Sequence, residues 1–223
     1  MSVLEVGPVE DGVVVVTLNR PDKRNALSIE LRDATSDALD RLAGDDAVRV
    51  VIVTGAGDVF CAGFDLGEFQ RMDDPEIAAR LWPSSDRYHR TCIDFPLPLI
   101  AAVNGPAIAG GFDLAVMCDI RVASERAAFA HPEITFGDVV YGPLHDLVGG
   151  AVARELCLTG RRVDAVEALS LRLVSTVVPH QAVVDEARRY AAMITQAPRD
   201  VLVRTKAKIA RRAGVSEGGT LNL

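Results

Sequence analysis

Two glycine-rich turns in this sequence could bind a negatively charged oxygen through their backbone amides. In the turn that ends in Gly110-Gly111, small residues let a ligand approach the main chain closely. The first amides of the following helix have no partner within that helix, and they favour an anion. The turn over residues 61–65 has the same character. One amide from each turn would form a two-donor oxyanion hole, although two ordinary tight turns would leave the same pattern.

Two carboxylates lie at predicted helix starts close to these turns. Asp113 lies just beyond the second turn, and Glu133 follows Pro132. Taken singly, each carboxylate is explained by the favourable interaction of a negative charge with a helix N-terminus. Beside two amide-rich turns, the pair indicates general acid and base catalysis next to a developing negative oxygen. That combination fits proton transfer at the carbon adjacent to a thioester carbonyl.

Other catalytic patterns are weak or absent in the sequence. Residues 55–60 begin like a dinucleotide fingerprint but lack the third small residue. Neither a GxxxxGK[ST] phosphate loop nor a GxSxG nucleophile elbow occurs. The histidines at 89, 131, 145 and 180 show no metal-ligand spacing, so we predict no metal site. His131 is close to Glu133 in sequence, but we expect it to be a surface or packing residue.

Apolar runs and amphipathic segments alternate along the chain, which predicts an α/β fold. A continuous β-branched run at 50–54 and an apolar run at 99–103 are typical of strands buried on both faces, as in a parallel sheet. Further strands are predicted within 3–18 and at 120–123 and 174–178. The predicted helices cover 29–42 behind a Ser28 cap, 70–94, 111–117, 154–158, 165–169, 182–195 and 201–213.

A local repeat links two of these strands to the two turns. Gly63-Phe64-Asp65-Leu66 recurs as Gly111-Phe112-Asp113-Leu114, and each copy comes shortly after a strand that is followed by glycine. Stacked units of this kind align their equivalent turns along one side. The repeat therefore predicts that both turns face a common groove.

Composition excludes several functional classes for this chain of 223 residues. A formal net charge of -7 with 5% aromatic residues argues against nucleic-acid binding. The longest apolar region, 97–118, is interrupted by glycine, proline and asparagine, so we expect no membrane span. No signal peptide is evident, and the four widely spaced cysteines are expected to be reduced and mostly buried. We expect a cytoplasmic protein.

A set of short segments occurs in order along roughly residues 12–180. They are Leu18-Asn19-Arg20-Pro21, Asn25-Ala26-Leu27, Phe60-Cys61-Ala62-Gly63-Phe64-Asp65-Leu66, Ile100-Ala101-Ala102-Val103-Asn104-Gly105-Pro106-Ala107, Gly110-Gly111-Phe112-Asp113-Leu114-Ala115, Cys118-Asp119-Ile120-Arg121, Phe129, Pro132-Glu133, Gly137, Leu158-Thr159-Gly160-Arg161, Ala165, Ala168 and Leu173-Val174. As a set they resemble the enoyl-CoA hydratase/isomerase superfamily, also called the crotonase superfamily. The resemblance implies a spiral of ββα repeats over residues 1–180, with a short C-terminal helical segment over 181–223.

The resemblance also assigns roles to individual residues. It implies that the backbone amides of Phe64 and Gly110 are the oxyanion donors, and that Asp113 and Glu133 are the catalytic pair. Glu133 would handle the proton at the α-carbon, while Asp113 would orient or deprotonate water. The coenzyme A part of the substrate would lie along Arg24, Ala26, Ala62, Asp65 and Leu66. The resemblance further implies a homotrimer or a dimer of trimers, with the coenzyme A thioester as substrate and no separate cofactor.

Three departures from the family pattern bear on the reaction. Asp113 stands where glutamate is usual, which resembles the dienoyl-CoA isomerases. The stretch 138–145 replaces a glycine-rich loop, so Asp138, Tyr141 or His145 could enter the acyl pocket, or the loop is merely reshaped. The family's C-terminal cover is expected to be shortened, and Lys206 and Lys208 could compensate by meeting coenzyme A phosphates.

These features leave three functions open. Hydration of a trans-2-enoyl-CoA is the first, because both carboxylate positions are occupied. Double-bond isomerisation by an enoyl-CoA or dienoyl-CoA isomerase, with Glu133, together with Asp113, as the proton shuttle, is the second. A non-catalytic acyl-CoA binding protein, in which the carboxylates only stabilise helix starts, is the third.

Overall fold

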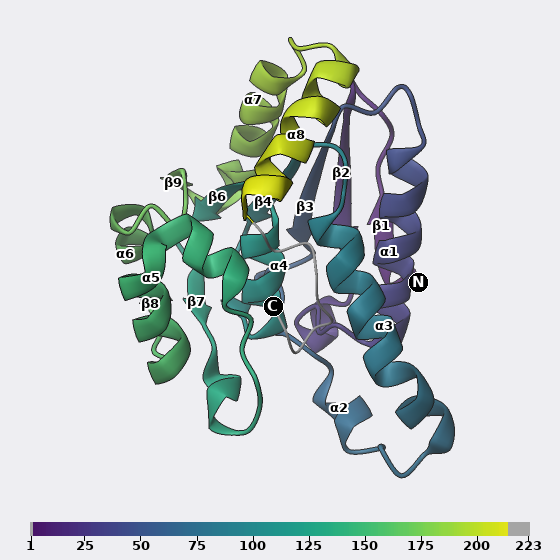
Figure 1. Ribbon diagram of the computed structural model, residues 1–223, viewed down its shortest axis with the longest axis vertical. Helices are drawn as coiled ribbons and strands as arrows, with labels where there is room; N and C mark the ends of the chain where they lie inside the picture. Colours follow the sequence, from purple (N-terminus) through teal and green to yellow (C-terminus); the bar gives the residue numbers. More distant parts are fainter. Residues whose placement is uncertain (1, 214–223) are drawn as a thin grey trace.

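A six-stranded sheet forms the centre of the protein in the computed structural model, which describes residues 2–213 (Figure 1). The strand order is β1-β2-β3-β4-β6-β9. Their bounds are Leu4–Val6, Val13–Leu18, Val50–Gly55, Leu99–Val103, Ile120–Ser124 and Thr176–Val178. Only the β1–β2 pair is antiparallel. The predicted α/β class with its parallel sheet is therefore confirmed, although the last strand begins two residues later than predicted.

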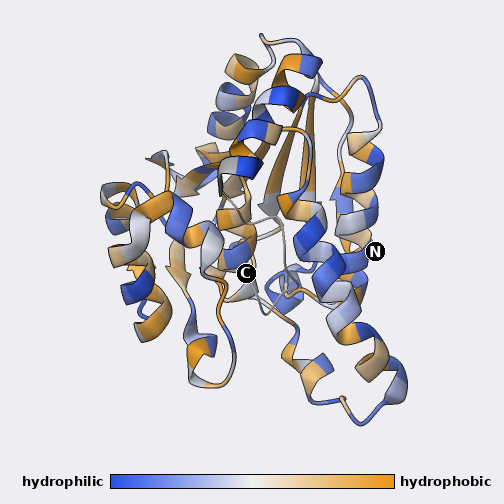
Figure 2. Cartoon of the chain, in the orientation of Figure 1, coloured by the Kyte–Doolittle hydropathy of each residue, from blue (hydrophilic) through white to orange (hydrophobic). Residues whose placement is uncertain are grey.

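The two faces of this sheet bury alternate residues. Val51 and Val53 belong to the larger core cluster, whereas Val50 and Ile52 pack against the other face. Side chains alternate across a strand, so a β-branched run with no polar member must be covered on both sides. Figure 2 shows the resulting apolar centre, with the polar residues gathered on the outer faces of the helices.

A short second sheet lies against the turns that carry the site. It contains β5, Ala107–Ile108, β7, Ala128–Ala130, and β8, Val163–Asp164. Isolated bridges extend this ladder, since Cys61 pairs with Ala107 and Leu27 pairs with Phe64. The same hydrogen-bonded layer therefore joins five segments that are far apart in the sequence.

Eight α-helices surround the sheets in the described part of the chain. Ser28 caps α1 by accepting a hydrogen bond from the Leu31 amide, as its position before an apolar repeat predicted. Helices α1 and α3 lie side by side (Figure 1). The bounds of the helices are Ile29–Ala43 for α1, Leu66–Phe69 for α2, Pro75–Ile93 for α3, Gly110–Met117 for α4, Gly142–Thr159 for α5, Ala165–Ser170 for α6, Val183–Ile194 for α7 and Arg199–Ala213 for α8.

The local sequence repeat does not superpose residue for residue in the fold. Asp65 precedes α2 and caps it through the Gly67 amide, whereas Asp113 lies inside α4. In the sheet Val51 pairs with Leu99, but in the turns Cys61 pairs with Ala107. The second copy thus reaches its turn two residues earlier, and this shift moves its aspartate from a cap into the helix.

The C-terminal helices pack on the sheet and its neighbours. Val183, Ala187 and Ala191 of α7 cover the second face of the sheet. The predicted boundary at residue 180 stays a prediction, and the part of the C-terminal segment beyond residue 213 lies outside the described residues. Within residues 2–213, no helix is both long and apolar enough to cross a membrane. The four cysteines are free and buried, as predicted.

Candidate active site

The two glycine-rich turns lie directly against each other. The Cys61 amide donates to Pro106 O, and the Ile108 amide donates to Cys61 O at 2.9 Å. A Cβ atom on Gly111 would lie 2.2 Å from Cys61 O, a distance that no larger residue could accept without moving the main chain. The predicted proximity of the two turns is therefore present in the fold, and backbone contact rather than side-chain packing produces it.

The amides of Phe64 and Gly110 are left unpaired by this arrangement. The Leu27 amide donates to Gly63 O at 2.8 Å, and the Asp65 amide donates to Leu27 O, so the bridge uses the groups on either side of Phe64. Gly110 is the first residue of α4, so its amide has no partner within the helix. Among the hydrogen bonds of the described residues, neither amide is a donor. Two free donors on adjoining turns are what an oxyanion hole requires.

Ala109 holds the second turn in an uncommon conformation. Its φ of 53° lies in the left-handed region, which residues with a side chain rarely occupy. The Ala109 amide donates to Ala130 O at 2.9 Å, and the amides of Phe112 and Asp113 both donate to Ala109 O. Strain of this kind persists where the surroundings over-determine the backbone, which is common at functional sites.

Asp113 and Glu133 meet around His131. The Nδ1 atom of His131 lies 2.9 Å from Oε1 of Glu133 and 3.7 Å from Oδ1 of Asp113. Asp113 is 4% exposed and His131 is 1% exposed. The His131 ring stacks on Phe112 with a centroid separation of 4.5 Å. The fold thus brings the predicted carboxylate pair together and adds an imidazole between the two side chains.

The expectation for His131 was incomplete. A surface position is wrong and packing is confirmed, but the residue also contacts both carboxylates, which the sequence interpretation missed. The signal was the sequence His131-Pro132-Glu133. Pro132 is the first residue of the 3-10 turn Pro132–Thr135 and has a fixed φ, and the side chains on either side of it, His131 and Glu133, contact each other.

Burial changes the acidity of Asp113. Removal from water raises the pKa of this carboxyl from 3.8 to about 7, with the charge of Glu133 adding to the rise and His131 opposing it. The Asp113 Oδ1 and Glu133 Oε2 atoms are buried and have no hydrogen-bond partner among the described residues. These oxygens are the ones available to a water molecule or a reacting group.

The same three side chains could hold a metal ion. Donor atoms of Asp113, His131 and Glu133 lie within 4.8 Å of one another, and no other such group occurs among the described residues. Zinc accepts nitrogen and carboxylate ligands of this kind. The prediction of no metal site considered spacing along the sequence, whereas Asp113 joins this group only through the fold. It stays a prediction.

The residues predicted to bind coenzyme A are assembled at one edge of the site. The Ala62 amide donates to Arg24 O at 3.0 Å, which places the two segments beside each other. Arg24 is exposed, and no ion pair within residues 2–213 involves its guanidinium. Asp65 pairs with Arg20 at 2.9 Å while capping α2, and Leu66 is exposed. Ala26 is half-buried beside them, and its carbonyl accepts a hydrogen bond from Arg20.

The proposed phosphate contact of Lys206 is wrong. Its ammonium is buried and lies 2.5 Å from both carboxylate oxygens of Asp119, so it ties α8 to the loop before β6. Lys208 is exposed on α8, and its contact with coenzyme A phosphates stays a prediction. The stretch 138–145 is a loop only as far as Tyr141, because residues 142–145 belong to α5. Asp138 in the loop and His145 in the helix are exposed, and the ring of Tyr141 lies 5.4 Å from that of His145. Their entry into an acyl pocket stays a prediction.

Comparison with known proteins gives one consistent result. The family model described as enoyl-CoA hydratase/isomerase matches residues 9–219. A protein of Thermus thermophilus with enoyl-CoA hydratase in its name is 40% identical over 194 residues, which cover 84% of this chain and 77% of that protein. A crystal structure of enoyl-CoA hydratase from Bacillus anthracis is 32% identical with a TM-score of 0.88, over 96% of this chain and 84% of that one. A monofunctional enoyl-CoA isomerase from M. smegmatis is 29% identical with a TM-score of 0.81, over 97% and 96% of the two chains.

Proposed function

The chain belongs to the enoyl-CoA hydratase/isomerase family, and we propose that it adds water to a trans-2-enoyl-CoA. The observation that carries the proposal is the buried contact of Asp113 and Glu133 around His131 beside two unpaired backbone amides. An enoyl-CoA isomerase that works through Glu133 alone needs one carboxylate to move a proton, whereas hydration uses a second to handle water. Both positions are occupied here.

In this mechanism the Phe64 and Gly110 amides bind the thioester oxygen and stabilise the negative charge that develops on it. Asp113 takes a proton from water as the water oxygen bonds to the β-carbon. Glu133 gives a proton to the α-carbon, so the double bond is lost and a 3-hydroxyacyl-CoA forms. Return of the proton from Asp113 to Glu133 through solvent completes the cycle. Coenzyme A enters as part of the substrate, and no step calls for another cofactor.

The experiment that tests hydration follows the fate of solvent oxygen. The protein is incubated with a short and a long trans-2-enoyl-CoA in heavy-oxygen water, and the products are weighed by mass spectrometry. Uptake of one labelled oxygen supports the hydratase. A shifted double bond without label identifies the isomerase instead, a possibility that the solved isomerase of similar fold keeps open. Absence of any product with either substrate would contradict the proposal.

The rate should depend on pH through the ionisation of Asp113. Desolvation holds the pKa of this carboxyl at about 7, so the base form is the minor species at pH 6 and the major one at pH 8. If Asp113 accepts the proton of water, kcat/KM rises with pH across this window, by about tenfold for a single ionisation. Initial rates between pH 6 and 8 measure the rise. A rate that falls over the same interval would assign Asp113 the role of an acid.

Arg24 should contribute to the affinity for the coenzyme A phosphates. An exposed charge pair is typically worth about 0.2–1 kcal/mol, so we expect Arg24→Gln to raise KM by a factor of about 1.4 to 5 with kcat unchanged. The effect should shrink with added salt. Arg41→Gln, which removes an exposed arginine from the opposite end of α1, is the matched control. Equal KM values for both variants would exclude Arg24 from the phosphate site.

Assembly into a homotrimer or a dimer of trimers stays part of the proposal. Light scattering of the purified protein at several concentrations measures it. Neither membranes nor nucleic acids have a place in the proposed reaction.

A further inference from the structure

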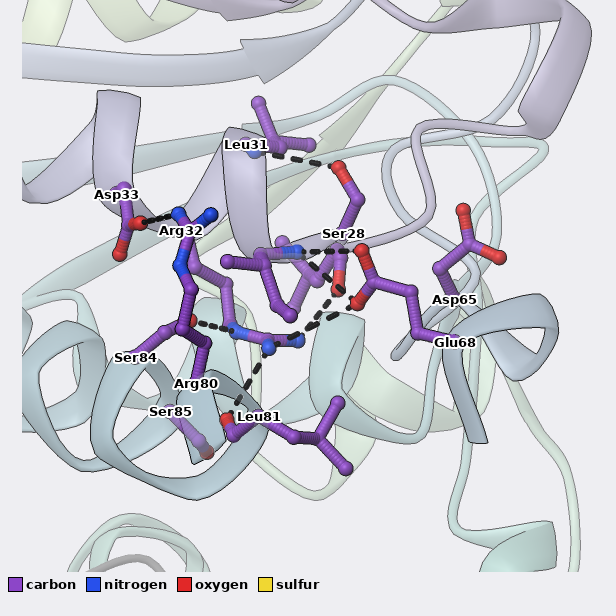
Figure 3. A network of polar contacts seen from close by, with 12 residues as sticks. Ser28, Leu31, Arg32, Asp33, Asp65, Glu68, Arg80, Leu81, Ser84 and Ser85 are labelled. Atoms are coloured by element: carbon purple, nitrogen blue, oxygen red, sulfur yellow. Dashed lines mark hydrogen bonds and ion pairs between the residues drawn. The ribbon is translucent and has the colours of Figure 1, made fainter. Parts of the chain in front are cut away.

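Arg32 is a fully buried arginine that the proposed chemistry does not use. It lies in the first turns of α1, and its side chain runs toward α3 (Figure 3). Its Nε donates to Ser84 Oγ at 2.8 Å, its Nη1 to Leu27 O at 2.7 Å and its Nη2 to Leu81 O at 3.2 Å. Every guanidinium nitrogen is thus committed to α3 or to the segment before α1.

Two of these contacts lead to the turn that carries the Phe64 amide. Leu27 O accepts from Arg32 and also from the Asp65 amide, so it joins the arginine to the residue after Phe64. The Arg32 guanidinium carbon also lies 4.7 Å from the centre of the Phe64 ring, a cation–π contact. A Cβ atom on Gly110 would lie 3.3 Å from the same ring, so the ring is in contact with the second turn as well.

Arg32 keeps its positive charge although burial disfavours the charged form. Burial lowers the pKa of Arg32 to about 10, which still leaves it positive at neutral pH. Within the described residues its carboxylate partner is Glu68, at 3.8 Å. Glu68 belongs to α2, directly after the turn, and accepts two close contacts from the Ile29 amide at the start of α1. Figure 3 shows Arg32 between Glu68 on one side and Leu81 and Ser84 on the other.

We infer that Arg32 is a positioning residue for the oxyanion site. By holding Leu27 O and the Phe64 ring together, its guanidinium fixes the direction of the Phe64 amide relative to that of Gly110. Because the ring contacts both turns, movement of the ring displaces the two donors relative to each other. This inference rests on the proposed function, since it assumes that the two amides bind the thioester oxygen.

The test replaces Arg32 by methionine, which keeps an unbranched apolar stem and removes the charge and every donor. Binding of an isotope-labelled acyl-CoA is followed by infrared spectroscopy of its thioester carbonyl. In the parent protein the carbonyl stretch should move to lower frequency on binding. In Arg32→Met we expect a smaller movement and a loss of kcat on the order of 10- to 100-fold, with KM changed little, because displaced catalytic groups reduce rate more than affinity.

Two further variants separate positioning from stability. Arg199→Met also removes an arginine that donates to backbone carbonyls. Arg199 is the first residue of α8, and its acceptors, Ala43 O and Val48 O, lie at and beyond the C-terminal end of α1, away from Arg32. This variant should lower the melting temperature and leave the carbonyl frequency unchanged. Arg32→Lys keeps the charge but cannot hold all three acceptors, so an intermediate frequency and rate are expected. It also serves if the methionine variant does not fold.

The outcomes discriminate between the two proposals. A folded Arg32 variant with the parent's frequency and kcat overturns the positioning role and leaves the proposed function intact. A parent protein that binds acyl-CoA without any carbonyl shift overturns the oxyanion site itself, and the role of Arg32 with it.

Discussion

The Glu133→Gln variant is expected to lose turnover by about 10²- to 10⁴-fold while binding acyl-CoA as well as the parent chain does. Glutamine has nearly the shape of glutamate and retains an oxygen that can face His131 Nδ1, which lies 2.9 Å from Oε1 in the parent. The substitution therefore leaves the local packing in place and removes only the group that exchanges a proton with the α-carbon. Steady-state rates and calorimetric titration with a saturated acyl-CoA measure the two quantities separately.

The control for this substitution is Glu125→Gln. Glu125 is an exposed glutamate just beyond β6, so its replacement changes the net charge equally without touching the buried cluster. Its turnover should match that of the parent. If Glu133→Gln binds the ligand and turns over normally, Glu133 is not the proton-transfer group. Loss of binding together with turnover would instead give Glu133 a structural role in the site.

The parallel sheet was predictable because its strands are fully buried. Runs such as Val50-Val51-Ile52-Val53 carry no polar residue, and only a strand covered on both faces accommodates that pattern. Helix α1 was equally clear, since a capping serine precedes its apolar repeat. Element ends were less clear, and the strand expected from residue 174 begins at Thr176 because the amides of Leu173 and Val174 donate to Ala168 O in α6 rather than to a neighbouring strand.

The positions of the two turns could be predicted, but their exact register could not. Glycine spacing indicated that both turns approach a common point, and the contact of Gly111 with Cys61 O explains why glycine is needed there. The shift of two residues between the copies depends on how the chain crosses from β4 to β5. No local pattern records that crossing, so the equivalence of Asp65 and Asp113 was only apparent.

Long-range polar contacts account for the remaining errors. Lys206 was placed on a basic helix face because its partner, Asp119, is remote in sequence. Arg32 drew no attention for the same reason, as its acceptors Leu81 and Ser84 come from another helix. Charged residues are usually exposed, so a sequence places them at the surface unless the fold supplies a partner.

Asp113 is the residue whose replacement should separate hydration from isomerisation. We expect Asp113→Asn to reduce hydration by about 10²-fold or more, because asparagine cannot accept the proton of water. Packing should be preserved, since the two side chains have similar shapes and Asp113 Oδ1 has no hydrogen-bond partner among the described residues that would be lost. The rise in rate across pH 7 should disappear in the same variant, because the carboxyl whose pKa is about 7 is gone.

The measurement is product analysis of Asp113→Asn beside Glu133→Gln in heavy-oxygen water. A hydratase loses labelled product in both variants, because each carboxylate carries one of the two proton transfers. An isomerase that works through Glu133 alone keeps shifting the double bond in Asp113→Asn and stops only in Glu133→Gln. A matched control is Asp119→Asn, which removes a carboxylate that lies outside the site and pairs with Lys206. This variant should lower the stability of the fold and leave hydration unchanged. Unchanged hydration in Asp113→Asn would remove the second carboxylate from the mechanism, because a group with no effect on the addition of water cannot be its base.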